Sequence, residues 1–260
     1  MDIIISVILA ALLIFVTLKK SAFTPAAAMS AGAILVTAAI CGSYAAIVVV
    51  LVAYGTVFAV DLVLGKRTEK ITGEINLKTG RRDVVQVLAN ATAAVIAIIL
   101  GKLFESPIGM VVYTSALTEC LADSLASDVG VLSKKDPVDV CRMRRIKRGM
   151  SGGVSLLGTV SALLGCLLMT LIFIAFFGFN TKNVVAVLVI PMIGILADSI
   201  LGSLVQAKYK CTVCGKYTEK KLHCEKPTEH AGGLKIINND MVNILSNFIT
   251  AILATVWLIA

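Results

Sequence analysis

The chain has 260 residues, 58% of them hydrophobic and 15% charged, and its formal net charge at pH 7 is +8. Soluble domains carry roughly 25% charged residues. This chain therefore has too few polar side chains to cover a water-facing surface, and a soluble protein is excluded. We expect an all-α fold, a polytopic integral membrane helical bundle.

Apolar blocks close to the roughly 20 residues that cross a bilayer predict eight transmembrane helices, at residues 2–18, 26–42, 44–64, 84–103, 107–126, 152–178, 183–205 and 240–260. The first block has Asp2 and no Lys or Arg before its apolar stretch, which favours a retained span over a signal peptide. Only Cys41 to Tyr44 separates the second block from the third, so seven spans with a re-entrant element is the alternative.

The basic residues alternate between the loops. The first, third, fifth and seventh loops carry 22 of the 24 Lys and Arg residues, whereas the even loops hold only Lys102 and Lys182. The positive-inside rule therefore predicts cytoplasmic odd loops and both termini outside. The alternation itself favours eight spans. Topology explains the basic charge, and since no stripe of basic residues is interleaved with aromatics, nucleic-acid binding is not expected.

The seventh loop, at 206–238, contains Cys211 and Cys214, followed by the neighbouring pair His223 and Cys224. Paired ligands of these types are typical of tetrahedral zinc sites, and disulfides are not expected to persist in a cytoplasmic loop. We predict a structural zinc ion on these four side chains, with free thiols as the alternative.

Four acidic residues, Asp61, Glu119, Asp123 and Asp198, lie within or at the ends of the predicted spans. An ionised side chain near the middle of a membrane costs about 2.5–3.5 kcal/mol, so such residues usually mark function. Polar residues also recur every four positions along five spans, which places each set on one helix face. These sets are Arg82, Gln86 and Asn90; Glu119, Asp123 and Ser127; Ser151, Ser155 and Thr159; Gly194, Asp198, Gly202 and Gln206; and Asn239, Asn243 and Asn247. Hydrogen bonding between membrane helices is the alternative explanation.

The direction of the helices gives these residues a common chemistry. The fourth, sixth and eighth spans start at the cytoplasmic side, where helix dipoles favour anions. Their starts are rich in donors: Arg81-Arg82, Gly149 to Gly153, and Asn238-Asn239. The Asp residues come from helices that end there, and carboxylates hold Mg²⁺. Phosphate donors beside Mg²⁺ ligands favour phosphoryl or nucleotidyl transfer.

One short segment is repeated. Leu121-Ala122-Asp123-Ser124-Leu125 returns 75 residues later as Leu196-Ala197-Asp198-Ser199-Ile200, and each copy is followed by a basic loop and another span. This spacing predicts a parallel repeat of helix pairs.

Several blocks, in order, resemble the integral membrane family of unknown function 92, which includes animal transmembrane protein 19 and a plant phytyl-phosphate kinase. The resemblance runs from Arg81 to the C-terminus. It is carried by Arg81-Arg82-Asp83-x-x-Gln86, Ala122-Asp123-Ser124-x-Ala126-Ser127-Asp128, Gly149-x-Ser151-Gly152-Gly153-Val154-Ser155, Asp198-Ser199-x-Leu201-Gly202, the Cys211/Cys214/His223/Cys224 loop and Asn238-Asn239-Asp240-x-Val242-Asn243. The chain departs from the family where Asp128 stands in place of a frequent Glu, a change that preserves a metal-binding carboxylate.

The resemblance implies a membrane-embedded kinase that uses CTP or another nucleoside triphosphate to convert an isoprenoid monophosphate to the diphosphate at the cytoplasmic face. It implies N-terminal transmembrane helices at 1–64 and a catalytic transmembrane core at 65–260. Partners are then the nucleotide, the isoprenoid lipid phosphate and membrane lipids. The alternatives are a CTP-dependent nucleotidyltransferase and an ion-coupled transporter.

Under this interpretation each candidate residue has a role. Mg²⁺ is held by Asp123, Asp128 and Asp198, and the phosphate charge is met by Arg81 and Arg82. The phosphate is cradled by Ser151, Gly152, Gly153 and Ser155, and oriented by Asn90, Asn239 and Asn243. Of these, we expect Asp123, Asp198, Arg82 and Asn90 to act in catalysis.

Overall fold

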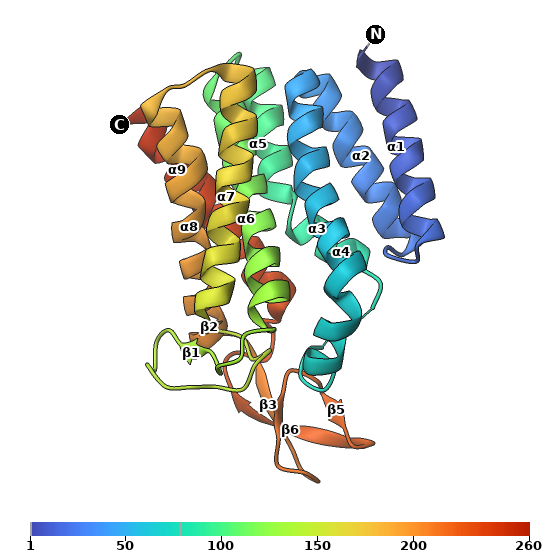
Figure 1. Cartoon of the computed structure of the whole chain (residues 1–260), viewed down its shortest axis with the longest axis vertical. Coiled ribbons are helices and arrows are strands. Elements are labelled where there is room, and N and C mark those ends of the chain that lie inside the picture. Colours follow the sequence, from blue (N-terminus) through green and yellow to red (C-terminus); the bar gives the residue numbers. More distant parts are fainter. Residues whose placement is uncertain (1, 78–79) are drawn as a thin grey trace.

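The computed structural model describes residues 2–77 and 80–260. Its helices, in chain order, are α1 (Asp2–Lys19), α2 (Pro25–Cys41), α3 (Tyr44–Thr72), α4 (Val84–Ala89), α5 (Thr92–Leu103), α6 (Ile108–Gly130), α7 (Leu156–Phe177), α8 (Thr181–Leu204) and α9 (Asn239–Ile259). The helices lie alongside one another as a bundle, and the short strands gather at one end of it (Figure 1).

Four of the described helices, α3, α7, α8 and α9, are long and apolar enough to cross a membrane. Shorter apolar helices cover Ile4–Lys19, Pro25–Cys41 and Thr92–Leu103. The predicted polytopic membrane bundle is therefore confirmed. Gly42 and Ser43 separate α2 from α3, and the Gly42 N–H ends α2 with a bond of 2.9 Å to the Ala38 carbonyl. The second and third predicted spans are thus two distinct helices.

The central helix is α6, which packs against α3, α5, α7, α8 and α9. Sixteen of its 23 residues are buried, including the polar side chains of Thr114, Ser115, Thr118 and Glu119. Polar groups in a bilayer need partners inside the protein. The hydroxyls of Thr114, Ser115 and Thr118 bond back to carbonyls one turn earlier, at 2.7–2.8 Å. A relatively polar helix is therefore stable here because its neighbours shield it from lipid.

Two predicted spans are wrong in detail. The block 84–103 is not one helix, because it breaks at Asn90 and Ala91 into the short α4 and the 12-residue α5. Asp83 and Gln86 form the capping box that starts α4, so Arg82 precedes the helix. The predicted stripe of Arg82, Gln86 and Asn90 therefore does not run along a continuous helix.

The block 152–178 becomes helical only at Leu156. Gly152 has φ +84°, a conformation that a right-handed helix excludes. Gly153–Val154 form β2, which pairs antiparallel with β1 (Val138–Asp139). The glycine-rich segment is therefore a turn and a strand in front of α7, and the predicted stripe of Ser151, Ser155 and Thr159 is interrupted.

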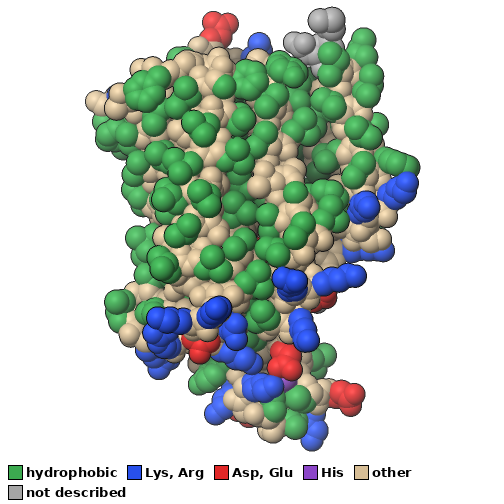
Figure 2. All heavy atoms as spheres, in the orientation of Figure 1, with side chains coloured by type: hydrophobic (Ala, Val, Ile, Leu, Met, Phe, Trp, Pro, Cys, Tyr) green, Lys and Arg blue, Asp and Glu red, His purple; other side chains and the backbone are tan. Residues whose placement is uncertain are grey.

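The strands β3 (Lys208–Cys211), β4 (Tyr217–Thr218), β5 (Leu222–His223) and β6 (Lys226–Gly232) form an antiparallel sheet in the order β4-β3-β6-β5. We call the end of the bundle formed by residues 66–77, 80–82, 133–155 and 205–238 the basic end. Lys and Arg side chains gather there, whereas the sides of the helices are mainly hydrophobic (Figure 2). α1 begins and α9 ends at the opposite end (Figure 1).

One hydrophobic core contains residues from Ala10 to Ala254 and so runs through both predicted parts of the chain. The predicted boundary after residue 64 falls inside α3, which continues to Thr72. The division into two parts stays a prediction.

Candidate active site

A cavity of about 820 Å³ opens at the basic end of the bundle. Its walls come from α3, α4, α6, α7, α8 and α9, together with the loops that join them. Every predicted site residue outside the Cys/His set lines this one cavity: Arg81, Arg82, Asn90, Asp123, Asp128, Ser151, Gly152, Gly153, Ser155, Asp198, Asn239 and Asn243. The predicted phosphate-binding and Mg²⁺-binding groups therefore face a common space, although they lie up to 162 positions apart in the sequence.

Backbone pairing fixes the position of Arg82. Its N–H donates to the Ala22 carbonyl at 2.8 Å, and its carbonyl accepts from the Thr24 N–H at 3.0 Å. The guanidinium lies 3.7 Å from Asp128 Oδ2, and both side chains are about a quarter exposed. The adjacent Arg81 donates to Ser21 Oγ at 2.9 Å. Both arginines are thus hydrogen-bonded to the turn between α1 and α2, and both line the cavity.

The turn from Ser151 to Gly153 is pressed against the end of α8. A Cβ on Gly152 would lie 2.6 Å from the Ser203 backbone, and a Cβ on Gly202 would lie 3.0 Å from the Gly152 nitrogen. Together with the positive φ of Gly152, these distances explain why glycine stands at both positions. The close approach brings the turn to the same cavity wall as Asp198.

The hydroxyls of this segment already have partners. Ser151 donates to Glu219. Ser155 is the N-cap of α7, where its Oγ accepts from the Gly158 N–H at 3.1 Å and lies 3.2 Å from the Gly130 carbonyl, to which it donates. Ser155 therefore ties the start of α7 to the end of α6, so a phosphate at this position must compete with the cap.

The two repeated Asp residues occupy equivalent places. Asp123 on α6 and Asp198 on α8 both line the cavity, and each of these helices packs against the next long helix, α7 or α9. Asp198 Oδ2 accepts from Ser246 Oγ at 3.2 Å. The two carboxyl groups thus line the same cavity, one from α6 and the other from α8.

A chain of amides crosses from α9 to α4. Asn243 Nδ2 donates to Asn90 Oδ1 at 3.2 Å, and Asn239 Nδ2 lies 3.5 Å from Asn243 Oδ1. Asn238 is the N-cap of α9 and accepts from the Met241 N–H at 3.0 Å. The expected donor-rich helix start is therefore present at α9, unlike at α7.

Glu119, one of the acids within the predicted spans, does not line the cavity. It is buried between helices, where Oε2 accepts from Asn247 Nδ2 at 2.7 Å. Asn247 also donates to the Ala116 carbonyl at 2.8 Å. These contacts fit the alternative of hydrogen bonding between helices, so the five predicted polar faces do not all serve the cavity.

Sequence reasoning missed Glu219. This side chain lines the cavity from the loop at 206–238, in which the sequence predicted only zinc ligands. It is 8% exposed. Burial raises its pKa to about 7, although the Ser151 hydroxyl acts in the opposite direction. No periodic signal could have found it, because its partner Ser151 lies 68 residues earlier.

Acids outnumber bases around the cavity. Among the described residues, five basic side chains line it, Lys20, Lys66, Arg81, Arg82 and Arg148, against seven acidic ones, Asp61, Glu69, Asp123, Asp128, Asp198, Glu219 and Asp240. A polyphosphate therefore meets more carboxyl groups than basic ones, although the raised pKa of Glu219 leaves that carboxyl partly protonated near neutral pH. A divalent cation would offset the carboxylates that are ionised.

The predicted zinc ligands also come together. One ligand atom each from Cys211, Cys214, His223 and Cys224 lies within 4.8 Å of every other. His223 Nδ1 lies 3.6 Å from Cys214 Sγ and 3.2 Å from Cys224 Sγ. The N–H groups of Val213 and Cys214 point to Cys211 Sγ at 3.4 Å each, which favours a thiolate. Two or more soft sulfur ligands and an imidazole in one cluster suit zinc.

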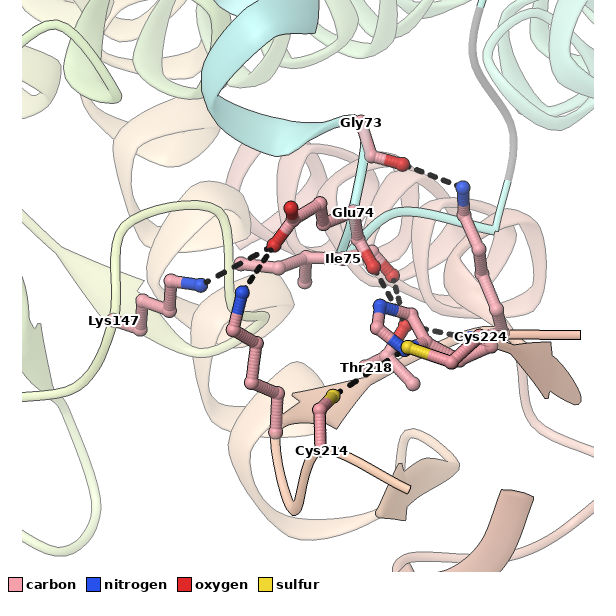
Figure 3. Close-up of polar contacts among 10 residues, drawn as sticks. Gly73, Glu74, Ile75, Lys147, Cys214, Thr218 and Cys224 are labelled. Atoms are coloured by element: carbon pink, nitrogen blue, oxygen red, sulfur yellow. Dashed lines mark hydrogen bonds and ion pairs between the residues drawn. The ribbon is translucent and has the colours of Figure 1, made fainter. Parts of the chain in front are cut away.

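The cluster lies on residues 208–224, which we call the Cys/His hairpin. This hairpin is bonded to the residues that follow α3 (Figure 3). Thr218 donates to the carbonyls of Glu74 and Ile75 at 3.0 Å each. The Lys216 ammonium donates to Glu74 Oε2 at 2.9 Å and lowers the pKa of that carboxyl. These contacts place the residue after Thr218, Glu219, against the cavity.

Comparisons with known proteins agree with a membrane protein. The family model described as Integral membrane protein DUF92 matches residues 8–251. Protein PGR of Arabidopsis thaliana is 29% identical over 205 residues, which cover 68% of this chain and 69% of the plant protein. The uncharacterized membrane protein MJ0933 of Methanocaldococcus jannaschii is 28% identical over 127 residues, 49% of this chain and 52% of the archaeal one. No solved structure matches the chain.

Proposed function

Because this chain belongs to the integral membrane family of unknown function 92, we propose that it is a membrane-embedded kinase that transfers a phosphoryl group from CTP or another nucleoside triphosphate to an isoprenoid monophosphate. Its product is the isoprenoid diphosphate. The choice of substrate is supported by the resemblance to this family, which includes a plant phytyl-phosphate kinase.

The observation that carries the proposal is the mixed lining of a single cavity. Arg81, Arg82 and the turn at Gly152 offer positive charge and backbone donors, while Asp123 and Asp198 stand on other walls of the same space. Phosphoryl transfer needs mainly positioning and neutralisation of charge.

In this proposal, Mg²⁺ makes the site usable by a polyphosphate. The acidic excess of the lining disfavours a bare nucleoside triphosphate, and the carboxylates of Asp123, Asp128 and Asp198 offer the hard oxygen ligands that Mg²⁺ prefers. The ion would neutralise charge on the transferred group. Arg82 and Asn90 would orient it, and Ser151 and Asn239 would hold the remaining phosphate oxygens.

A nucleotidyltransferase that makes an activated lipid from the same partners is the second candidate, because the same set of donors and carboxylates also serves attack at the α-phosphorus. The two reactions differ in their products. The kinase releases a nucleoside diphosphate and the nucleotidyltransferase releases pyrophosphate.

The test is turnover by the purified full chain in detergent with Mg²⁺, each nucleoside triphosphate in turn, and a panel of prenyl monophosphates. Formation of a prenyl diphosphate with a nucleoside diphosphate supports the kinase, and pyrophosphate release supports the second candidate. Absence of both across the panel contradicts a transferase and leaves an ion-coupled transporter, which uptake into proteoliposomes would detect.

Two further properties belong to the proposal. The basic end faces the cytoplasm, as the positive-inside rule favours, so that the nucleotide reaches the cavity from the cytosol. The Cys211, Cys214, His223 and Cys224 cluster holds a structural Zn²⁺ that fastens the hairpin under the cavity. The geometry of the four ligand atoms supports this ion.

A further inference from the structure

We propose that the hydrocarbon tail of the lipid phosphate lies between α7 and α8, in an apolar arm of the cavity. We define this arm by Gly158, Thr159 and Ala162 of α7 and by Met192, Ile195 and Leu196 of α8, all of which line the cavity. The inference rests on the proposed function, since it assigns a place to the substrate of that reaction.

The arm extends beyond the carboxylates toward the middle of the bundle. Along α8, which ends at the basic end, Met192 comes six residues before Asp198, or about 9 Å at 1.5 Å per residue. Leu196, Ile195 and Met192 are the α8 residues that line this stretch, and all three are apolar. Ala162 lies seven residues beyond the N-cap Ser155, or about 10 Å along α7.

Small side chains line the α7 side of the arm. Ala162 is 1% exposed and belongs, with Ala122 and Cys166, to a small apolar cluster that is separate from the main core. Met192 and Ile195 pack against this cluster from α8. Alanine on α6 and α7 therefore faces larger side chains on α8, and a longer side chain at Ala162 would have to displace Met192 or Ile195 and so narrow the inner end of the arm.

The arm also reaches the surface of the bundle that faces lipid. Leu196 is 47% exposed although it lines the cavity, and Thr159 is exposed on the facing helix. A lipid could therefore enter sideways from the membrane, with its tail between α7 and α8.

The two ends of the cavity differ in polarity and together match an amphipathic ligand with an anionic head. The wide end of the cavity presents Arg81, Arg82 and the Ser151–Gly153 turn, and the arm presents hydrocarbon. A nucleotide has no apolar group for the arm, whereas a prenyl phosphate has an anionic head and a tail of the required kind. A tail that enters sideways passes from one hydrocarbon environment to another, so the fit of the tail to the arm, and not transfer out of water, sets the preference for tail length.

The experiment fills the arm and compares tail lengths. Ala162→Phe should lower kcat/KM for long-chain prenyl monophosphates by about tenfold or more while short-chain ones change less than about twofold, because pocket discrimination by a few carbons has this size. Leu164→Phe is the matched control, since Leu164 is on the same helix and 60% exposed. Met192→Ala, which enlarges the arm, should shift the preference toward longer tails. If Ala162→Phe does not fold, this variant alone tests whether the tail lies in the arm.

A second measurement separates this inference from the proposed function. A prenyl phosphate with a photoreactive group on its tail should label peptides of α7 and α8, and Ala162→Phe should remove the label. Labelling of this kind without any turnover would contradict the kinase but support the tail site. Turnover with equal tail-length dependence in the wild type, Ala162→Phe and Met192→Ala would overturn the tail site alone. Equal competition by a phospholipid of similar length would also overturn it, since the arm would then be a crevice for bulk lipid.

Discussion

At the scale of single residues, substitutions of Asp123 and Asp198 distinguish a role in binding Mg²⁺ from a role in helix packing. Asn keeps the size of Asp and most of its hydrogen bonding but removes the charge. If these residues hold Mg²⁺, each Asp→Asn variant should fold with a near-normal unfolding temperature and lose about 10²–10³-fold in kcat, the usual cost of one catalytic electrostatic contact. Turnover per folded molecule, measured beside the thermal unfolding curve, gives both values.

Glu119→Gln is the matched control for these variants. Glu119 is an acid on the same helix as Asp123, but it is buried outside the cavity and bonded to Asn247. Gln keeps an acceptor for that bond, so kcat should change less than about threefold. Near-normal turnover in both Asp→Asn variants would contradict the metal role, and the Asp residues would then serve only to join helices.

Glu219 should give the folded protein a specific pH dependence. Burial raises its pKa to about 7, above its unfolded value of about 4.3. A group whose pKa is raised on folding stabilises the fold fully below the unfolded pKa and loses that contribution as pH rises through the folded pKa. Between pH 4.5 and pH 7.5 the wild type should therefore lose up to about 3 kcal/mol relative to Glu219→Gln.

The measurement for Glu219 is the free energy of unfolding of both proteins in the same detergent across this pH range. Using the difference between the two cancels titration of the other groups. A pH-independent difference would contradict the raised pKa and would mean that the pKa of Glu219 is the same in the folded and unfolded states, with a cation or Lys208 offsetting the effect of burial.

At the scale of elements, the Cys/His hairpin should depend on its metal. Purified protein should contain about one zinc per chain, and Cys214→Ser should lower both the zinc content and the unfolding temperature, the latter by about 5 °C or more, since a metal ligand contributes directly to folding. Activity should fall as well, because the hairpin holds Glu219 against Ser151. Metal analysis and thermal unfolding check the prediction.

Cys141→Ser is the control for the hairpin. Cys141 is also an exposed free cysteine at the basic end, but it lies outside the cluster. It should leave zinc content and unfolding temperature unchanged. Active protein without zinc, or equal effects of the two substitutions, would contradict a zinc site and favour free thiols.

The elements also show what the sequence could and could not predict. Apolar blocks found all the long helices, because the length of a span follows from the thickness of the bilayer. The breaks at Asn90 and before Leu156 were missed because they depend on local caps and on the positive φ of Gly152. Hydropathy does not report either property.

The candidate site was predictable for a related reason. Residues such as Asp198 and Asn243 are conspicuous because polar groups are costly in a membrane, so their spacing, together with the predicted directions of the helices, indicated a common space. Glu219 was hidden, because a single acid in a polar loop is unremarkable, and its place at the cavity depends on the pairing of Thr218 with the end of α3. Such long-range contacts have no local pattern.

At the scale of the whole molecule, the remaining prediction is the orientation in the membrane. Cys141 is exposed at the basic end, and Lys182 is exposed in the first turn of α8, near the other end. In intact cells, a thiol reagent that cannot cross membranes should miss Cys141 and label Lys182→Cys, and after permeabilisation it should label both. Lys182 is a better position than Glu105, whose φ of +50° makes a substitution there harder to interpret.

The pattern of labelling bears directly on the chemistry. Nucleoside triphosphates are found in the cytosol, and the cavity is lined by Arg148 and Gly149, at the same basic end as Cys141. Labelling of Cys141 from outside intact cells would therefore reverse the orientation and remove the nucleotide supply on which the proposed kinase reaction depends. Protection of Cys141 together with labelling of Lys182→Cys would leave the cavity facing the cytosol, with the apolar arm between α7 and α8 as the route from the membrane and the basic end as the route for the nucleotide.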